Sequence, residues 1–383
     1  MIDAMMGAGL KHALLDVWED IPKLRGQPER WMEFPDAHFD FLGKNLTPWV
    51  KNAWPQVKHA LSDGIATYDW VMKNKPDAVV VWLDEYPRWR GAAMAARDLK
   101  IPAIEIVHGN THIIQLDHWS TKKYVTHALG SWEAHDWYAW YNLPVQFVAT
   151  GSIQQDIYVG KDPKQLRDTS RFELNIPAHA QVVTVLTDAV FARSPWQDPG
   201  FYYGAFVEFV KAWKMARAII PGLQLVVKTH PYEKIPETGG KVTTEDYAHL
   251  LKRWGIEEDI TIVDDPLILA LAPADVVVSR PSSALATALH LGIPCLVYSE
   301  QPFFDRAKYP GRGFMVATEP PEILSHLTAM LYDDDLIKLL VKGTVAGARY
   351  FSGAGGATHR VAQAIRQIAR GEEPHESCWG PLP

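Results

Sequence analysis

Short apolar runs alternate with helix-like segments along most of this chain, and this alternation constrains the fold more than any other feature. In the first half, the apolar runs are residues 77–83, 101–107, 124–129 and 145–150. In the second half, they are residues 181–186, 224–228, 260–263, 275–279 and 294–298. Runs that are apolar throughout, rather than at every second residue, indicate parallel strands covered by helices on both faces. We therefore expect an α/β protein with two doubly wound, Rossmann-like domains.

The same pattern predicts where the domains begin and end. Residues 1–165 form the first predicted domain and residues 176–350 form the second. Residues 160–175 are charged and lack clear periodicity, so they are a candidate linker. The glycine-rich stretch "FSGAGGATHR" at 351–360 interrupts the pattern, and a last helix is predicted near residues 358–370.

Composition narrows the class of protein. The 383 residues are 47% hydrophobic and carry a formal net charge of −7, so the totals show no basic surface of the kind that binds nucleic acid. Two cysteines give neither a disulfide framework nor a zinc pattern, which favours a reducing compartment. No apolar run reaches the ~18 residues that a transmembrane helix needs, and no signal peptide is recognisable. We expect a soluble, cytoplasmic protein.

Tryptophan is unusually frequent, and most of it lies in the first half. Eleven of the 15 tryptophans precede residue 151. Aromatic packing in the core is the ordinary explanation for any one of them. The alternative is a cleft in which aromatic rings stack on sugars or bases.

The stretch "SRPSSALATALHLG", residues 279–292, is the first candidate binding site. It follows the apolar run at 275–279 and leads into a predicted helix at 284–291. Ligands of open parallel sheets bind at the carboxyl ends of the strands, where free N–H groups of a following helix favour anions. Ser282 and Ser283, with Arg280 adjacent, are therefore a candidate phosphate cradle. An ordinary helix cap without a ligand is the alternative.

A second polar cluster follows another strand of the same predicted sheet. The run at 224–228 ends in Lys228-Thr229-His230-Pro231, where the proline stops the strand. A cation and an imidazole, Lys228 and His230, should therefore share an edge of the sheet with the serines. This combination favours a phosphate site over an isolated structural histidine.

Together these motifs resemble a known family. "VVKTHP" followed by "ADVVVSRPSSALATALHLGIPCLVY" resembles the donor domain of GT-B glycosyltransferases, closest to the branch with His-Pro and Ser-Ser motifs. That branch includes bacterial sialyltransferases, capsule Kdo transferases and CDP-glycerol transferases. "PAIEIVHGN" resembles the His-Gly turn of the same branch. The resemblance covers about residues 75–370, and it implies two Rossmann-like domains facing a central cleft. It also implies that residues 356–371 form a helix crossing back to the first domain.

The resemblance implies roles for individual residues. Ser282 and Ser283 would hold the donor phosphates, and His230 with Lys228 would neutralise the departing phosphate, without a metal. Many relatives carry an acidic residue in the helix after the serines, where it holds the ribose; this chain has Thr287 there. Asp264 and Asp265 stand where the family contacts the base, although a solvated loop is the preferred interpretation.

Non-hydrolysing UDP-N-acetylglucosamine 2-epimerases share the same fold, and the order and spacing of the motifs are similar. Those enzymes place a carboxylate just before the turn that reads His108-Gly109 in this chain. Here the residue at that position is Val107, which disfavours epimerisation.

An inverting transfer also needs a general base, which should come from the first domain. Asp84 and Glu85 follow the apolar run at 77–83, and Glu85 takes the position of the catalytic acid in the epimerase pattern. Glu85 is therefore the first candidate for the general base, followed in order by His108, Asp84 and Asp188. A helix cap, or an ion pair with Arg88 or Arg90, is the alternative for Asp84 and Glu85.

The function implied by the resemblance is a metal-independent, inverting glycosyltransferase without a cofactor. Its donor would be a UDP-, CMP- or CDP-linked sugar, and its acceptor would be a glycan hydroxyl. One alternative acceptor is a hydroxymethylated base in phage-type DNA, held by the tryptophans with Arg88, Arg90, Lys122 and Lys123. The first 150 residues carry 15 Lys and Arg against 18 Asp and Glu, a balance of −3, which does not favour DNA. A CDP-glycerol-type phosphotransferase and a non-catalytic nucleotide-binding relative are further alternatives.

Overall fold

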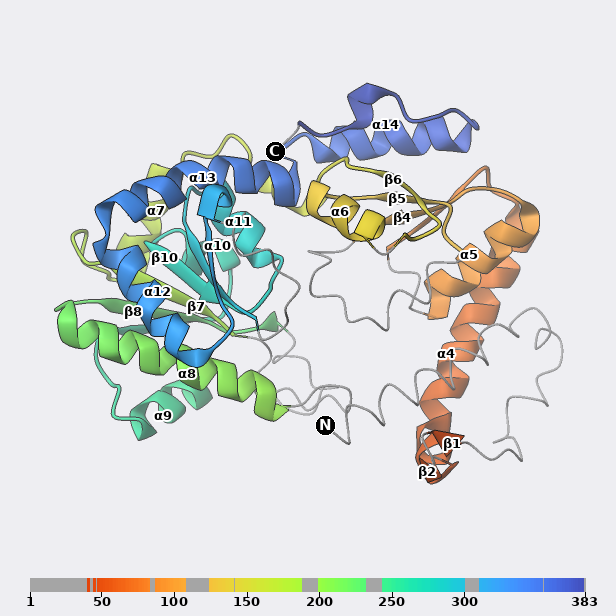
Figure 1. The fold of residues 1–383 in the computed structure, drawn as a ribbon. Coiled ribbons are helices and arrows are strands. Elements are labelled where there is room, and N and C mark those ends of the chain that lie inside the picture. The colour runs from red at the N-terminus through yellow and green to blue at the C-terminus, as the bar shows by residue number, and fades with distance from the viewer. Residues whose placement is uncertain are drawn as a thin grey trace. The chain divides into compact units, whose positions relative to one another are not determined.

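The chain divides into two compact units (Figure 1). The first comprises residues 1–150 and 358–380, and the second comprises residues 151–357 and 381–383. This is a computed structural model. It describes residues 40–41, 44–45, 47–82, 87–107, 124–140, 142–187, 199–231, 243–299, 310–353 and 355–381. Among these residues, no helix is both long and apolar enough to cross a membrane.

The first unit is built on a four-stranded parallel sheet. Its strands run in the order β3 (Val79–Val81), β4 (Ala103–Ile106), β5 (His127–Leu129) and β6 (Gln146–Val148). The helices are α4 (Thr47–Asn74), α5 (Pro87–Leu99), α6 (Trp132–Trp140) and most of α14 (Ala357–Ala369). A short antiparallel pair, β1 (Asp40–Phe41) and β2 (Lys44–Asn45), precedes α4.

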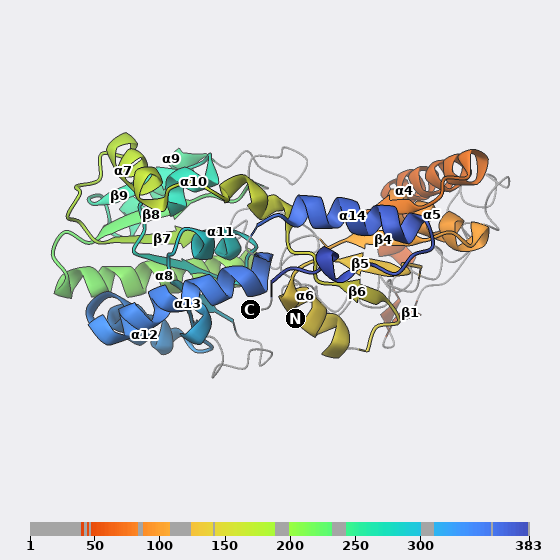
Figure 2. The same cartoon turned by 90° about the horizontal axis from the view of Figure 1, so that it is seen from above.

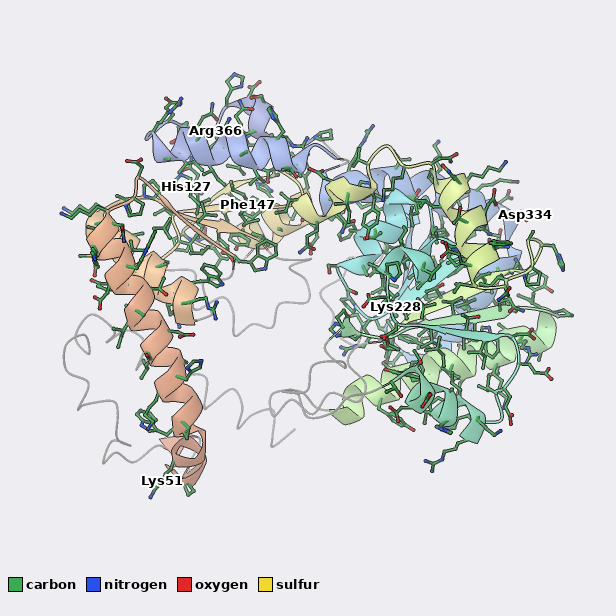
Figure 3. The ribbon with its side chains drawn as sticks, turned by 180° about the vertical axis from the view of Figure 1, so that it is seen from behind. Lys51, His127, Phe147, Lys228, Asp334 and Arg366 are labelled. Atoms are coloured by element: carbon green, nitrogen blue, oxygen red, sulfur yellow. The ribbon has the colours of Figure 1, made fainter. Side chains whose placement is uncertain are left out.

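Helix α14 belongs to the first unit although it is more than 200 residues away along the chain from that unit's last strand. The Arg360 Nε atom donates to the Thr150 carbonyl at 2.7 Å, and the Gly380 N–H donates to the Ala149 carbonyl at 2.6 Å. Figure 3 shows Arg366 on this helix beside the sheet that carries His127 and Phe147. The polypeptide therefore completes its first unit only at its C-terminal end.

Helices α4 and α5 pack so closely that glycine is required at their contact. A Cβ atom on Gly91 would lie 2.0 Å from the carbonyl oxygen of Gly64. We expect Gly91→Ala to destabilise the first unit by about 1–3 kcal/mol, because two backbones must separate to make room for one methyl group. Urea denaturation followed by circular dichroism measures the loss. The control is Gly204→Ala on helix α8 (Pro199–Ile219), where the new methyl group meets open space and should cost little. Gly222→Ala is unsuitable as a control, because the φ of +78° at Gly222 would add backbone strain. Equal losses for Gly91→Ala and Gly204→Ala would contradict this account.

The second unit contains a six-stranded sheet in which all strands are parallel. Across the sheet the order is β12 (Phe314–Ala317), β11 (Cys295–Tyr298), β10 (Val276–Ser279), β7 (Val182–Leu186), β8 (Gln224–Lys228) and β9 (Ile260–Val263). In chain order this is the doubly wound pattern, which grows in one direction from β7 and then in the other from β10. The predicted α/β class with parallel sheets is confirmed for both units, and the second unit shows the doubly wound order.

Helices cover both faces of this sheet (Figure 2). Helices α8 (Pro199–Ile219), α9 (Thr244–Arg253) and α12 (Pro320–Tyr332) contribute to the larger core, which includes fully buried Trp213 and Tyr247. Helices α7 (Pro163–Glu173), α10 (Leu267–Leu271) and α11 (Ala284–His290) lie on the opposite face, with a smaller core around Val226 and Ala270. The strands are apolar throughout because both of their faces are buried.

Residues predicted to be a linker instead form helix α7 of the second unit. Asp162 caps the helix by accepting from the Lys164 N–H at 2.9 Å, and Pro163 occupies the first turn. Arg171, 5% exposed, anchors the helix to the segments that precede β7 and β10. The division between units therefore falls at residues 150 and 151 rather than between 165 and 176.

The two chain segments that connect the units are bonded to each other within the second unit. One segment holds the short helix η3 (Ile153–Tyr158), and the other follows α13 (Asp334–Ser352). The Ser152 N–H donates to the Ser352 carbonyl at 3.0 Å, and the Ala357 N–H donates to Asp156 Oδ1 at 3.1 Å. Gly355 has a φ of +92°, and a Cβ atom there would lie 2.6 Å from Val159 Cγ2. The glycines of "FSGAGGATHR" thus allow a turn that is tightly packed against the other segment.

Candidate functional site

The strand order of the second unit predicts where a ligand binds. The direction of winding reverses between β7 and β10, which are neighbours. At such a reversal the connections leave to opposite faces, and a crevice opens at the carboxyl ends of the two strands. β7 ends at Leu186 and Thr187, and β10 ends at Ser279, directly before the serine turn.

A cavity of about 350 Å³ lies at this edge. It is lined by the ends of β7 and β8, the start of α10, the serine turn with α11, and η3. Five of the residues predicted for the donor site line it together: Lys228, His230, Ser282, Ser283 and Thr287. The cavity lies wholly within the second unit.

Lys228 and His230 form one side of the cavity. Lys228 is the last residue of β8 and is 4% exposed (Figure 3); its Nζ donates to the Thr229 carbonyl at 2.6 Å and lies 3.8 Å from Asp265 Oδ1. Burial, together with the positive charge of Lys228, lowers the pKa of His230 to about 4. His230 is therefore neutral at pH 7 and can gain a proton when negative charge arrives.

The serine turn forms the opposite wall. Ser282 Oγ accepts from the Ala284 N–H at 3.3 Å, which is a weak local contact. Ser283 caps α11 without a side-chain hydrogen bond to the helix, and its hydroxyl has no protein partner in the described part of the chain. One hydroxyl is thus used locally, and the other is available to a ligand in the cavity.

Thr287 has a partner that the sequence did not indicate. Its Oγ1 donates to Gln155 Oε1 at 2.9 Å, and both side chains are buried, at 1% and 5% exposure. Gln155 lies on η3, 132 residues away in sequence, and also lines the cavity. Sequence motifs are local, so no signal near the serine turn could have identified this contact.

Other predicted residues have different outcomes. Arg280 lies in the bend between β10 and the serines and is not among the described residues that line the cavity. Asp265 lines the cavity, whereas Asp264 accepts a hydrogen bond from Thr229 Oγ1 at 2.7 Å. Glu85, Asp84, His108 and Asp188, the candidate bases, lie outside the described residues.

Ser279 lies at the end of β10, directly before the serine turn. Its side chain is fully buried, and its Oγ makes no hydrogen bond with any described residue. It is not among the described residues that line the cavity.

The acidic run at residues 333–335 stands at the start of α13. Asp333 caps this helix, with its side chain accepting from the N–H groups of Asp335 and Leu336 at 3.0 Å each. The run therefore has a structural role as a helix cap.

Comparison with known proteins finds a similar architecture in solved structures. The chain matches no protein-family model and no curated protein sequence. It is similar to a structure provisionally named UDP-N-acetylglucosamine 2-epimerase from Listeria monocytogenes, with a TM-score of 0.59 and 14% identity, covering 97% of this chain and 95% of that one.

Two further solved structures are similar over most of their length. The first is Anabaena HepE in complex with UDP-glucose, with a TM-score of 0.55 and 13% identity over 78% of this chain and 81% of that one. The second is a glycosyltransferase from Rickettsia africae, with a TM-score of 0.53 and 10% identity over 82% of each chain. At these identities the likeness establishes the fold: this chain has the GT-B-like fold, with two α/β units that are each built on a parallel sheet.

Proposed function

We propose that this protein is a glycosyltransferase that moves a sugar from a nucleotide-activated donor to a hydroxyl acceptor. The observation that carries the proposal is the cavity at the switch point of the second unit, where Lys228, His230 and Ser283 meet. The Ser283 hydroxyl makes no hydrogen bond to its own helix. Each of these groups can contact phosphate oxygens, and the cavity is polar where the strands end. Solved neighbours that contain UDP-glucose or are named as a glycosyltransferase support a nucleotide-sugar donor.

The chemistry of the proposed reaction matches these groups. Glycosyl transfer breaks the bond between the sugar and the donor phosphate, and negative charge develops on the departing oxygen. Lys228 is positioned to stabilise that charge, and His230 can take up a proton as the charge develops. The acceptor hydroxyl loses its proton to a base, for which Glu85, His108 and Asp84 are the proposed candidates.

Epimerisation is the second candidate, because one of the similar structures carries that name. Transfer is favoured by Val107, a buried apolar residue at the end of β4. Related epimerases place a carboxylate at this position. Incubation of the protein with UDP-N-acetylglucosamine alone separates the two reactions, since only epimerisation proceeds without an acceptor.

A glycan remains the proposed acceptor. The similar structures that we describe concern UDP-sugars and give no support to the DNA alternative. The mass of the product distinguishes a transferred sugar from a transferred phosphoglycerol, because only the latter adds phosphorus.

The first test is a thermal-shift screen with UDP, CMP, CDP, GDP and dTDP. A ligand that binds only the folded state, at about 100 times its Kd, raises the free energy of unfolding by about 3 kcal/mol. We expect one nucleotide to raise the melting temperature, and Ser283→Ala to reduce that shift because a phosphate contact is lost. Ser325→Ala, on the exposed face of α12, is the matched control and should retain the full shift. Absence of any shift in the wild-type protein would remove the proposed donor site.

A further inference from the structure

A second cavity, of about 390 Å³, lies at the opposite edge of the six-stranded sheet. Gln181, Asp275 and Pro294 line it, and these residues directly precede β7, β10 and β11. Because the sheet is parallel, its amino ends lie away from the carboxyl ends that form the proposed donor cavity. The two cavities share no lining residue in the described part of the chain. Small-molecule sites typically measure about 300–1,000 Å³, so this cavity is large enough for a ligand of its own.

Most of the cavity wall is apolar. Its large apolar side chains are Leu291, Ile293, Met330, Leu331, Ile337 and Val341. The first four are buried, whereas Val341 on α13 is 44% exposed, so the apolar surface continues from the interior to the solvent. A ligand with an apolar body would remove this surface from water, which favours binding.

Two cations of α7, Lys164 and Arg167, line the same cavity. The Arg167 guanidinium is held in place, because Nη1 donates to the Ala274 carbonyl at 2.9 Å and Nη2 donates to Asp275 Oδ1 at 2.6 Å. A guanidinium has further N–H donors, and those of Arg167 have no partner among the described residues. The Lys164 ammonium makes no ion pair or hydrogen bond with any described residue. Both side chains can therefore bind an anion without losing a contact within the protein.

The charge of the lining matches an anion with one negative charge. Asp275 is the only acidic residue among the described residues that line the cavity. Its carboxylate already accepts from Arg167, from Arg171 and from the Val182 N–H, so it does not compete for Lys164. Two cations and one carboxylate leave one positive charge. A carboxylate neutralises it, whereas a phosphate monoester carries about 1.5 to 2 negative charges at pH 7 and exceeds it.

The volume limits the length of the ligand. At about 30 Å³ for each water-sized group, the cavity has room for about a dozen non-hydrogen atoms, which excludes a lipid with two long chains. A carboxylate on a chain of about eight to ten carbons fits this space. We propose that the cavity is a binding site for a medium-chain monocarboxylate, whose head group contacts Lys164 and Arg167 while its chain packs on the apolar wall. This site does not depend on the proposed function.

The test is isothermal titration calorimetry of the protein with four probes. Octanoate, used below its micelle concentration, carries both the charge and the chain. Octanol keeps the chain without the charge, acetate keeps the charge without the chain, and octyl phosphate carries a larger charge. We expect one octanoate per chain, bound about ten- to a hundredfold more tightly than octanol, because the alcohol cannot form the charge-assisted hydrogen bonds. Acetate should show no measurable binding, and octyl phosphate should bind no more tightly than octanoate.

Three variants locate the binding in this cavity. Lys164→Ala, at an exposed position where folding should be unaffected, should weaken octanoate about tenfold and leave octanol unchanged. Val341→Gln should weaken both probes by a similar factor, because apolar contact is lost. Lys342→Ala is the matched control and should keep the affinity, since Lys342 is an exposed neighbour of Val341 on α13 but is not among the described residues that line the cavity.

The outcomes separate this inference from general binding to the surface and from the proposed function. Octanoate that fails to bind, or that binds no more tightly than octanol, would overturn it. Equal effects of Lys164→Ala and Lys342→Ala would also overturn it, because binding would then follow surface charge, and tighter binding of octyl phosphate would overturn the assignment to a carboxylate. A protein that binds no nucleotide can still bind octanoate, so failure of the donor site leaves this result unaffected.

Discussion

We expect Arg171→Ala to lower the free energy of unfolding of the second unit by about 3–5 kcal/mol. The Arg171 guanidinium is buried and donates to the carbonyl groups of Pro177, Ala178, Ala180 and Pro273 at 2.8–3.3 Å. It also donates to Asp275 Oδ2 at 3.3 Å. Alanine would remove the donor that joins the segment before β7 to the segment before β10, and the carbonyl of buried Pro273 would lose its hydrogen bonds.

Urea denaturation measures this loss as a lower midpoint with an unchanged slope. Arg167→Ala is the matched control, because Arg167 lies one turn earlier on α7 and bonds the same Asp275, yet is one-third exposed. We expect it to cost about 1 kcal/mol, as is typical of exposed ion pairs. Arg171→Lys should recover less than half of the loss, since one ammonium cannot serve all of these carbonyl groups. A loss for Arg171→Ala no larger than that for Arg167→Ala would refute the role of Arg171 as an anchor.

The second large effect concerns His230, whose replacement by asparagine should lower kcat/KM by about 10²–10³-fold. Its pKa of about 4 in the free protein means that it is neutral at pH 7. The phosphates of a donor would raise that pKa, so the complex binds a proton that the free protein does not. By linkage, the affinity for the donor then increases as the pH falls, by at most about tenfold per pH unit.

UDP-glucose is a suitable probe, because its diphosphate diester keeps the same charge between about pH 5.5 and 8, so any pH dependence belongs to the protein. Calorimetric titration of the protein with UDP-glucose, in buffers of different ionisation enthalpy, measures how many protons are taken up on binding. On binding UDP-glucose at about pH 6, the wild-type protein should take up a fraction of a proton. The His230→Asn variant should take up less. His290→Gln serves as the control, since burial also lowers the pKa of His290 but His290 does not line the cavity. Equal uptake by the wild-type protein and His230→Asn would exclude His230 as the proton acceptor.

The strands were predictable because their signal is physical and local. β8 and β9 begin and end at the predicted residues, since a strand buried on both faces must be apolar throughout. β12 was missed because four apolar residues after a glycine-rich turn do not by themselves distinguish a strand from a helix. The full length of α13, Asp334–Ser352, is also hard to read from the sequence. Glycine disfavours a helix, so Gly347 suggests that the helix ends before it. The structure instead needs glycine at this position, because a Cβ atom there would lie 2.2 Å from the Arg312 carbonyl oxygen.

The site was predictable to the extent that it follows from strand ends. Lys228, His230 and the serines come together because all strands of one parallel sheet have their carboxyl ends at the same edge. Gln155 depends instead on where a distant segment packs, and one sequence carries no record of that contact. The linker prediction failed for a related reason: only Ser170 and Arg171 of α7 are buried, so the helix shows little apolar periodicity.

The hydrogen bonds between Ser152 and Ser352 and between Asp156 and Ala357 have a consequence for the evolution and engineering of this chain. The second unit is an insertion, because residues of the first unit precede and follow it. Its two ends are adjacent, as domain insertion requires. A circular permutant of the second unit could therefore be made, in which a short linker joins residue 357 to residue 151 and the new termini lie in an exposed loop. The permutant would retain every residue that lines the proposed nucleotide cavity within one continuous polypeptide.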